Sequence, residues 1–162
     1  MQEGLTITRT FNAPKSMVFN AFANADALAA WWGPKGMPVT VHKLDFKPGG
    51  IFHYKMEGNG QMMWGVFHYG NIVEPDMIEF VSSFSDEEGN ICKSPFPIDF
   101  PLEVFNRFTL EENNGITTLT LKGHPINATA EQQETYNSMF KSIEAGFGGT
   151  FDQLDTYLLS QK

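Results

Sequence analysis

The fold is decided by the stretch Ala130-Glu-Gln-Gln-Glu-Thr-Tyr-Asn-Ser-Met-Phe-Lys-Ser-Ile-Glu-Ala-Gly-Phe-Gly-Gly-Thr-Phe-Asp-Gln-Leu-Asp-Thr-Tyr-Leu-Leu159. Thr129 and Gln132 have the spacing of a capping box at its start. The apolar side chains recur with the period of one helix face: Tyr136, Met139, Phe140, Ile143, Phe147, Phe151, Leu154 and Leu158. This spacing predicts one long amphipathic helix near the end of the chain.

Three glycines, Gly146, Gly148 and Gly149, lie in the middle of this predicted helix. Each costs about 1 kcal/mol relative to alanine in a helix interior. One explanation is a bend, or a close approach of the helix to a sheet. The other is space that is left free for a bound molecule, and the two explanations are compatible.

The composition is that of a soluble globular domain with an unusual aromatic content. The chain has 162 residues, of which 41% are hydrophobic and 19% charged, and this size suits a single domain over residues 1–162. It contains 15 Phe and 8 Met residues. Such bulky and adaptable side chains fill a core and can also line an apolar pocket.

Charge and cysteine content narrow the classes of partner. The net charge is −8 and no stripe of Lys and Arg is present, so we expect neither nucleic acid nor an anionic membrane as a partner. No apolar run approaches the roughly 18 residues that a membrane span needs. The single cysteine, Cys92, excludes an internal disulfide, and the first residues lack the pattern of a signal peptide. We therefore predict a cytoplasmic location.

In the rest of the chain, the spacing of apolar residues changes from a mixed pattern to an alternation with a period of two. A strand over 5–11 precedes two short helices, one opening at Pro14 and one over 27–32 that Asn24 or Asp26 can cap and that Gly33-Pro34 stops. Six strands follow, with turns at Gly58-Asn59-Gly60 and Asn113-Asn114-Gly115. Their predicted ranges are 39–46, 51–57, 61–73, 77–84, 102–110 and 116–121. The order predicts an α+β fold in which a curved antiparallel sheet of six to seven strands grips the terminal helix.

The segment 85–101 stands apart because its prolines, Pro95, Pro97 and Pro101, rule out a central strand. Phe96 and Phe100 lie between them. A long loop with aromatic side chains is often a lid or a contact surface, and it can equally fold onto its own core. The sequence leaves both readings open.

Several motifs together resemble one family. The chain is similar to the activator of heat-shock-protein-90 ATPase homologue-like family, within the START-like, helix-grip superfamily. The resemblance rests on Arg9-Thr-Phe-Asn-Ala-Pro14, Ala30-Trp-Trp-Gly-Pro34, Phe46-Lys-Pro-Gly-Gly50, Phe84-Ser-Asp-Glu-Glu-Gly89, Gly115-Ile-Thr-Thr-Leu-Thr120 and Gly146-Phe-Gly-Gly-Thr-Phe-Asp-Gln-Leu154. Phe147 departs from the pattern, since many relatives have Trp there. The resemblance implies a helix-grip fold with a deep apolar cavity, but no single activity.

Candidate cavity residues follow from the hairpin register. If residues 59 and 60 form the turn, Phe52 faces Phe67, Tyr54 faces Gly65 and Met56 faces Met63, which makes this face apolar. Gly65 opposite Tyr54 allows the ring to pack over it, or widens the cavity locally. The opposite face carries His53, Lys55, Glu57, Trp64, Val66 and His68 and should be mostly wet. The predicted ligand-binding residues are Trp32, Phe52, Tyr54, Met56, Phe67, Phe84, Phe105, Phe147 and Phe151.

Evidence for chemistry is weak. His53 and His68 share the outer face, but no third ligand and no metal-binding spacing accompany them, so we predict no metal and no cofactor. No nucleophile motif is present, and no catalytic residue is predicted. The acidic cluster 86–88 is expected to be a solvated turn. Of the pair Trp31 and Trp32, one should seal the core and the other could face the pocket.

Three functions remain. The favoured one is a binding module that holds a small apolar or amphipathic molecule between sheet and helix. The alternative is a co-chaperone-like interaction module that stimulates a heat-shock ATPase through the 85–101 segment and the acidic surface. The third is an enzyme of the cyclase, dehydratase or hydrolase type that some helix-grip relatives represent. A homodimer is a further expectation.

Overall fold

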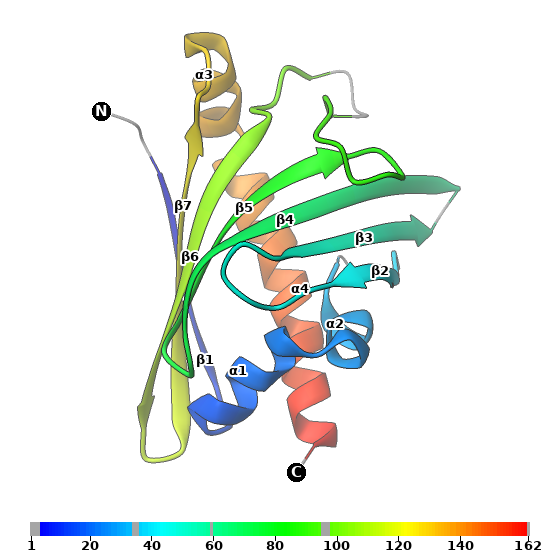
Figure 1. The fold of residues 1–162 in the computed structure, drawn as a ribbon. Helices are drawn as coiled ribbons and strands as arrows, with labels where there is room; N and C mark the ends of the chain where they lie inside the picture. Colours follow the sequence, from blue (N-terminus) through cyan, green and yellow to red (C-terminus); the bar gives the residue numbers. More distant parts are fainter. Residues whose placement is uncertain (1–3, 34–35, 59, 95–97, 162) are drawn as a thin grey trace.

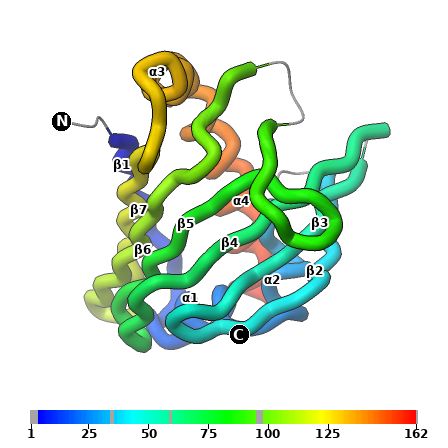
Figure 2. Tube along the Cα trace, turned by 45° about the horizontal axis from the view of Figure 1, so that its top comes forward, coloured from blue at the N-terminus to red at the C-terminus, as the bar shows by residue number. Residues whose placement is uncertain are grey.

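A computed structural model describes residues 4–33, 36–58, 60–94 and 98–161. Seven antiparallel strands form one curved sheet with the spatial order β1-β7-β6-β5-β4-β3-β2 (Figures 1 and 2). The last helix runs diagonally across the concave side of this sheet. The elements are β1 (Leu5–Phe11), α1 (Lys15–Ala23), α2 (Ala25–Trp31), β2 (Val39–Leu44), β3 (Ile51–Gly58), β4 (Gln61–Val73), β5 (Met77–Ser85), β6 (Glu103–Asn113), β7 (Ile116–Ile126), α3 (Ala130–Ser138) and α4 (Phe140–Ser160). The predicted α+β helix-grip architecture is confirmed.

The predicted hairpin register is also confirmed. Phe52 pairs with Phe67, Tyr54 with Gly65 and Met56 with Met63 across β3 and β4. Asn59 of the predicted turn lies outside the described residues, as do Pro34, Pro95, Phe96 and Pro97. The second hairpin turns through Asn114 and Gly115, with φ of 55° and 81°, which suits the Asn-Gly pair of a tight turn.

The terminal helix is two helices rather than one. The capping box of Thr129 and Gln132 begins α3 as predicted, but the helix is interrupted at Met139, where φ is −102° and ψ is 7°. Helix α4 then runs through the three glycines without interruption. A Cβ atom on Gly146, Gly148 or Gly149 would meet nothing within 4 Å. The glycines therefore mark neither the interruption nor a close approach to the sheet.

The two halves of α4 are held differently. In the C-terminal half, Phe151, Leu154 and Leu158 are fully buried, and the Phe151 ring meets that of Phe11 edge-on with centroids 5.9 Å apart. Thr150 Oγ1 donates a hydrogen bond to the Gly33 carbonyl at 3.2 Å. In the N-terminal half, no residue from 140 to 149 is fully buried. The helix is thus anchored at one end and leaves room under the other.

The outer face of β3 and β4 is drier than predicted. His53 and Val66 are buried, at 2% and 0% exposed. His53 lies beneath the turn that follows β5: its Nε2 is 3.1 Å from the Asp86 carbonyl oxygen, and its ring stacks on Trp64. The prediction of a wet face was wrong here because a loop distant in sequence covers these strands.

Candidate functional site

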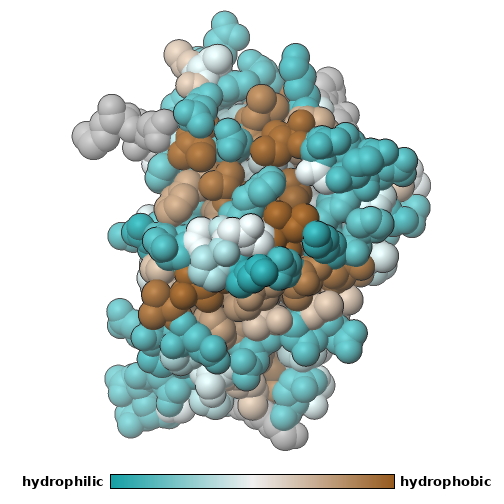
Figure 3. All heavy atoms as spheres, in the orientation of Figure 1, coloured by the Kyte–Doolittle hydropathy of each residue, from teal (hydrophilic) through white to brown (hydrophobic). Residues whose placement is uncertain are grey.

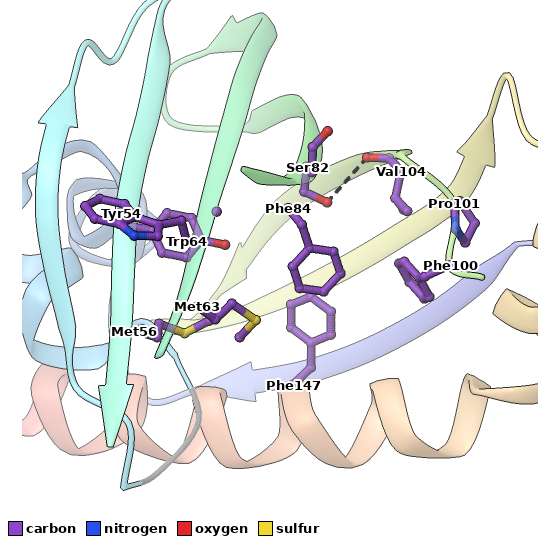
Figure 4. A pocket seen from close by; sticks show the side chains of 12 residues that line it. Tyr54, Met56, Met63, Trp64, Ser82, Phe84, Phe100, Pro101, Val104 and Phe147 are labelled. Carbon is purple, nitrogen blue, oxygen red and sulfur yellow. Dashed lines mark hydrogen bonds between the residues drawn. The ribbon is translucent and has the colours of Figure 1, made fainter. Parts of the chain in front are cut away.

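A cavity of about 320 Å³ lies between the N-terminal half of α4 and strands β3 to β6. Figure 4 shows Phe147 rising from the helix toward Phe84, with Met56 and Met63 on one side of the space and Phe100 on the other. The lining residues are Tyr54, Met56, Met63, Trp64, Gly65, Ser82, Ser83, Phe84, Phe100, Pro101, Val104 and Phe147. Almost all of this wall is hydrocarbon, aromatic ring or thioether.

A second space of about 230 Å³ adjoins the first. Tyr54, Met56 and Phe147 line both, so these three side chains form the partition between them. The second space is completed by Trp32, Gly33, Ile143, Gly146 and Thr150. Gly146 thus lies at a cavity wall, which agrees with the reading that a helix glycine leaves space free.

The two adjacent tryptophans occupy different environments, as expected. Trp31 is fully buried and its indole Nε1 donates to the Ala21 carbonyl at 2.8 Å. Trp32 is partly exposed and lines the second space. The ring of Trp32 also meets that of Tyr54 edge-on, with centroids 6.3 Å apart. Trp31 therefore seals the core, and Trp32 faces the cavity.

The Tyr54 phenol is the only titratable group among the described lining residues of the larger cavity. Burial raises the pKa of Tyr54 to about 12, and the neighbouring Trp32 indole N–H partly opposes this shift. The phenol is therefore neutral at physiological pH and can act as a hydrogen-bond donor or acceptor.

Five of the nine predicted residues reach a cavity wall: Trp32, Tyr54, Met56, Phe84 and Phe147. Three others lie in the core instead. Phe52 and Phe67 are buried against each other with ring centroids 5.1 Å apart, and Phe151 packs on Phe11. They support the site from behind.

Phe105 lies on the other face of the sheet, which corrects its placement in the cavity. Its ring is close to the imidazole of His124 and to the guanidinium of Arg107. Val104, Asn106, Phe108 and Leu110 are the buried residues of this strand. Because Val104 and Phe105 are both apolar, the alternation of β6 alone did not decide which of them faces inward.

Two residues of the 85–101 segment line the cavity although the sequence pattern did not predict them. Phe100 and Pro101 line the cavity, and the Phe100 ring contacts the rings of Phe84 and Tyr136. This end of the segment folds onto the core and closes one side of the space. The adjacent Phe100 and Pro101 are the sequence feature that could have indicated a cavity wall here. Met63 could have been predicted from the hairpin register, because it faces Met56.

The acidic cluster is a turn, as expected. Asp86 Oδ1 accepts hydrogen bonds from the backbone N–H groups of Asn90 and Glu88 at 2.9 and 3.0 Å. These bonds, above all the one from Asn90, lower the pKa of the Asp86 carboxyl. Within the described ranges, no group of three or more His, Cys, Asp or Glu side chains could hold a metal ion. His53 and His68, the pair weighed for a metal, belong to no such group.

Comparison with known proteins agrees with this architecture. The sequence model of the family described as Activator of Hsp90 ATPase homolog 1-like protein matches residues 12–159. The chain belongs to this family. No match was found among curated proteins. None of the described helices of this family member is long and apolar enough to cross a membrane.

Solved structures from several bacteria resemble this family member. The crystal structure of protein Ms6760 from Mycobacterium smegmatis is 30% identical, with 94% of this chain and 88% of that chain covered and a TM-score of 0.76. A solution structure of a protein from Arthrobacter aurescens is 26% identical, with 97% and 86% covered and a TM-score of 0.81. The AHSA1 protein from Silicibacter pomeroyi is 20% identical, with 99% and 100% covered and a TM-score of 0.75, a likeness of fold alone.

Proposed function

We propose that the protein binds a small apolar or amphipathic molecule in the cavity under the N-terminal half of α4. The observation that carries the proposal is the space of about 320 Å³ whose described walls contain no charged side chain. Its size falls within the range of ligand pockets, and its mix of rings, thioethers and a few polar groups is typical of them. Hydrophobic residues also gather on the face of the molecule seen in Figure 3.

Two methionines offer a matched test. Met63 lines the cavity, whereas Met62, the preceding residue of β4, points to the other face and is 53% exposed. We expect Met63→Trp to fill the space and to abolish binding of a neutral fluorescent dye such as Nile red, while Met62→Trp leaves binding unchanged. Native mass spectrometry of freshly purified protein should show extra mass from a retained ligand. Equal dye binding by wild type and both variants, with no extra mass, would remove the proposal.

A second candidate function is a co-chaperone-like interaction, which membership of the Activator of Hsp90 ATPase homolog 1-like family favours. Ile98, near the end of the 85–101 segment, and Leu102, the residue after it, are each 40% exposed. The test is the rate of ATP turnover by an Hsp90-class chaperone with and without this protein. Under this candidate, Ile98→Asp with Leu102→Asp reduces the stimulation and Ile116→Asp, at the distant β6–β7 turn, does not. An unchanged ATPase rate with wild-type protein excludes it.

The third function, catalysis, finds less support in the geometry. It requires an acid or base beside a pocket tyrosine. The buried Glu79 side chain accepts hydrogen bonds from Asn71 and Arg107 and is not among the described lining residues, and His53 lies on the outer face. We therefore propose binding rather than catalysis, together with the homodimer and the cytoplasmic location expected from the sequence.

A further inference from the structure

The polar groups of the cavity wall are few, and all of them are neutral. Ser82, Ser83 and Tyr54 carry the side-chain hydroxyl groups of the described lining, and no Lys, Arg, His, Asp or Glu joins them. A buried carboxylate or ammonium without a partner is strongly disfavoured and releases or takes up a proton instead. An ionised ligand head would thus enter this space without compensation.

The Ser82 hydroxyl is oriented toward a donor role. Its oxygen accepts a hydrogen bond from Asn106 Nδ2 at 3.0 Å, and Asn106 is itself buried and held by a second bond to the Val104 carbonyl at 3.0 Å. The Ser82 hydroxyl donates to that same carbonyl over 3.5 Å, which is long for an O–H···O hydrogen bond (Figure 4). A ligand oxygen at normal distance would be the better acceptor for this proton.

The Tyr54 phenol has the same polarity. Its oxygen lies against the Gly65 backbone, and the side chain of the neighbouring Trp32, edge-on at 6.3 Å between ring centroids, can only donate hydrogen bonds. The phenol proton can be donated. Tyr54 forms part of the partition between the two spaces, and Ser82 lies in the wall of the larger one. Both hydroxyls therefore favour a hydrogen-bond acceptor in the ligand.

We infer that the cavity selects a neutral ligand, with an apolar body and a hydrogen-bond-accepting oxygen such as a ketone, ester or alcohol, over a carboxylate of the same length. Ser82 is the residue that recognises this oxygen. The inference rests on the proposed function, because it concerns the same cavity.

The test compares probes with one chain length and different heads: 2-decanone, 1-decanol, decanoate and decane at neutral pH, titrated into the full chain and followed by amide NMR shifts. We expect 2-decanone and 1-decanol to bind about tenfold or more tightly than decanoate, since the charged head loses its hydration without a partner. Ser82→Ala should weaken 2-decanone binding about three- to tenfold, the range of one hydrogen bond, and leave decane unchanged. Ser16→Ala, an exposed serine of α1, is the matched control.

The outcomes separate the two proposals. If none of the four probes binds, the proposed function itself is wrong. If decane binds but decanoate binds as tightly as 2-decanone, the cavity is a ligand site and the inference about its head group fails. A Ser82→Ala variant that weakens all probes equally would also overturn the role of Ser82, because a general loss reports a changed cavity. Tyr54→Phe, with the same readout, tests the second hydroxyl.

Discussion

The Tyr54 ring lies directly against the bare backbone of Gly65 on the neighbouring strand: a Cβ atom on Gly65 would be 2.5 Å from both Cζ and Oη of Tyr54. The packing explanation for this glycine is therefore confirmed. Because the same ring belongs to the partition between the two cavities, this one contact ties the sheet register to the shape of the site.

Gly65→Ala should destabilise the protein, because the new methyl group forces the Tyr54 ring out of place. We expect a loss of about 1–3 kcal/mol in the free energy of unfolding, the range for overpacking, measured by urea denaturation. Gly70→Ala is the control on the same strand, since its Cβ would meet its nearest neighbours at 3.7 and 3.8 Å. Equal stabilities of the two variants would contradict the contact.

Gly148→Ala and Gly149→Ala should stabilise the protein. Both positions are helical, and an added Cβ would meet nothing within 4 Å. Each substitution should contribute about 0.5–1 kcal/mol through helix propensity and the unfolded state, or roughly 2–4 °C in Tm per kcal/mol for a chain of this size. Gly33→Ala, at φ of 98° and close to Met56 and Val39, should do the reverse. A thermal scan in which both α4 variants melt earlier would show that these glycines have a structural role.

Phe147→Ala should join the two cavities, since its ring is part of their partition. We expect tighter binding of probes that are too bulky for the wild type, measured by the same NMR titration. The stability cost should stay below the roughly 3–5 kcal/mol of a fully buried phenylalanine, because Phe147 is only half-buried. Phe151→Ala is the comparison: it should cost that full amount. Unchanged selectivity in the Phe147 variant would mean that the partition is not rigid.

Stability should fall steeply in alkali. Burial raises the pKa of Tyr54 and Tyr136 to about 12, and it raises that of Tyr69 as well. Above an unfolded pKa of about 10 the unfolded chain loses these protons first, so the folded state binds more protons and the free energy of unfolding decreases as pH rises. Below that pH the three phenols contribute no slope.

The alkaline loss can be measured by urea denaturation at a series of pH values, with phenolate absorbance as a second readout. Tyr54→Phe should make the loss shallower, because one of the three linked protons is removed. A stability that does not change between pH about 9 and 12 would show that these phenols ionise equally easily in both states.

Much of the fold could be predicted because its signals are local. Alternation and the turn residues set the β3–β4 register, so the sequence alone predicts the observed pairing of Tyr54 with Gly65. The interruption at Met139 could not be predicted, because that residue keeps the apolar helix spacing on both sides. The covered outer face depends on a loop that reaches His53 from Asp86, a contact across 33 positions.

The site was predicted less completely than the fold. The sheet face that a side chain occupies cannot be predicted where two neighbours are equally apolar, as at Val104 and Phe105. A buried polar residue such as Asn106 also interrupts the expected alternation of apolar and polar residues. Phe100 and Pro101 come from an irregular segment, where no period links position to direction. A third difficulty is the position along the strands. Phe52 and Phe67 face inward as predicted, yet they lie where side chains fill the core and not at the cavity.

Because α4 is packed into the core only in its C-terminal half, substitutions that change the cavity are separated from substitutions that change stability. In the proposed binding module, substitutions at residues 140–149 would change the space under the helix, while Phe151, Leu154 and Leu158 continue to hold the chain folded. Under the proposed function, a lineage would acquire a new ligand through changes in a single helical segment, without first evolving extra stability to tolerate them. Related chains with this scaffold could diverge in specificity while their architecture stays the same.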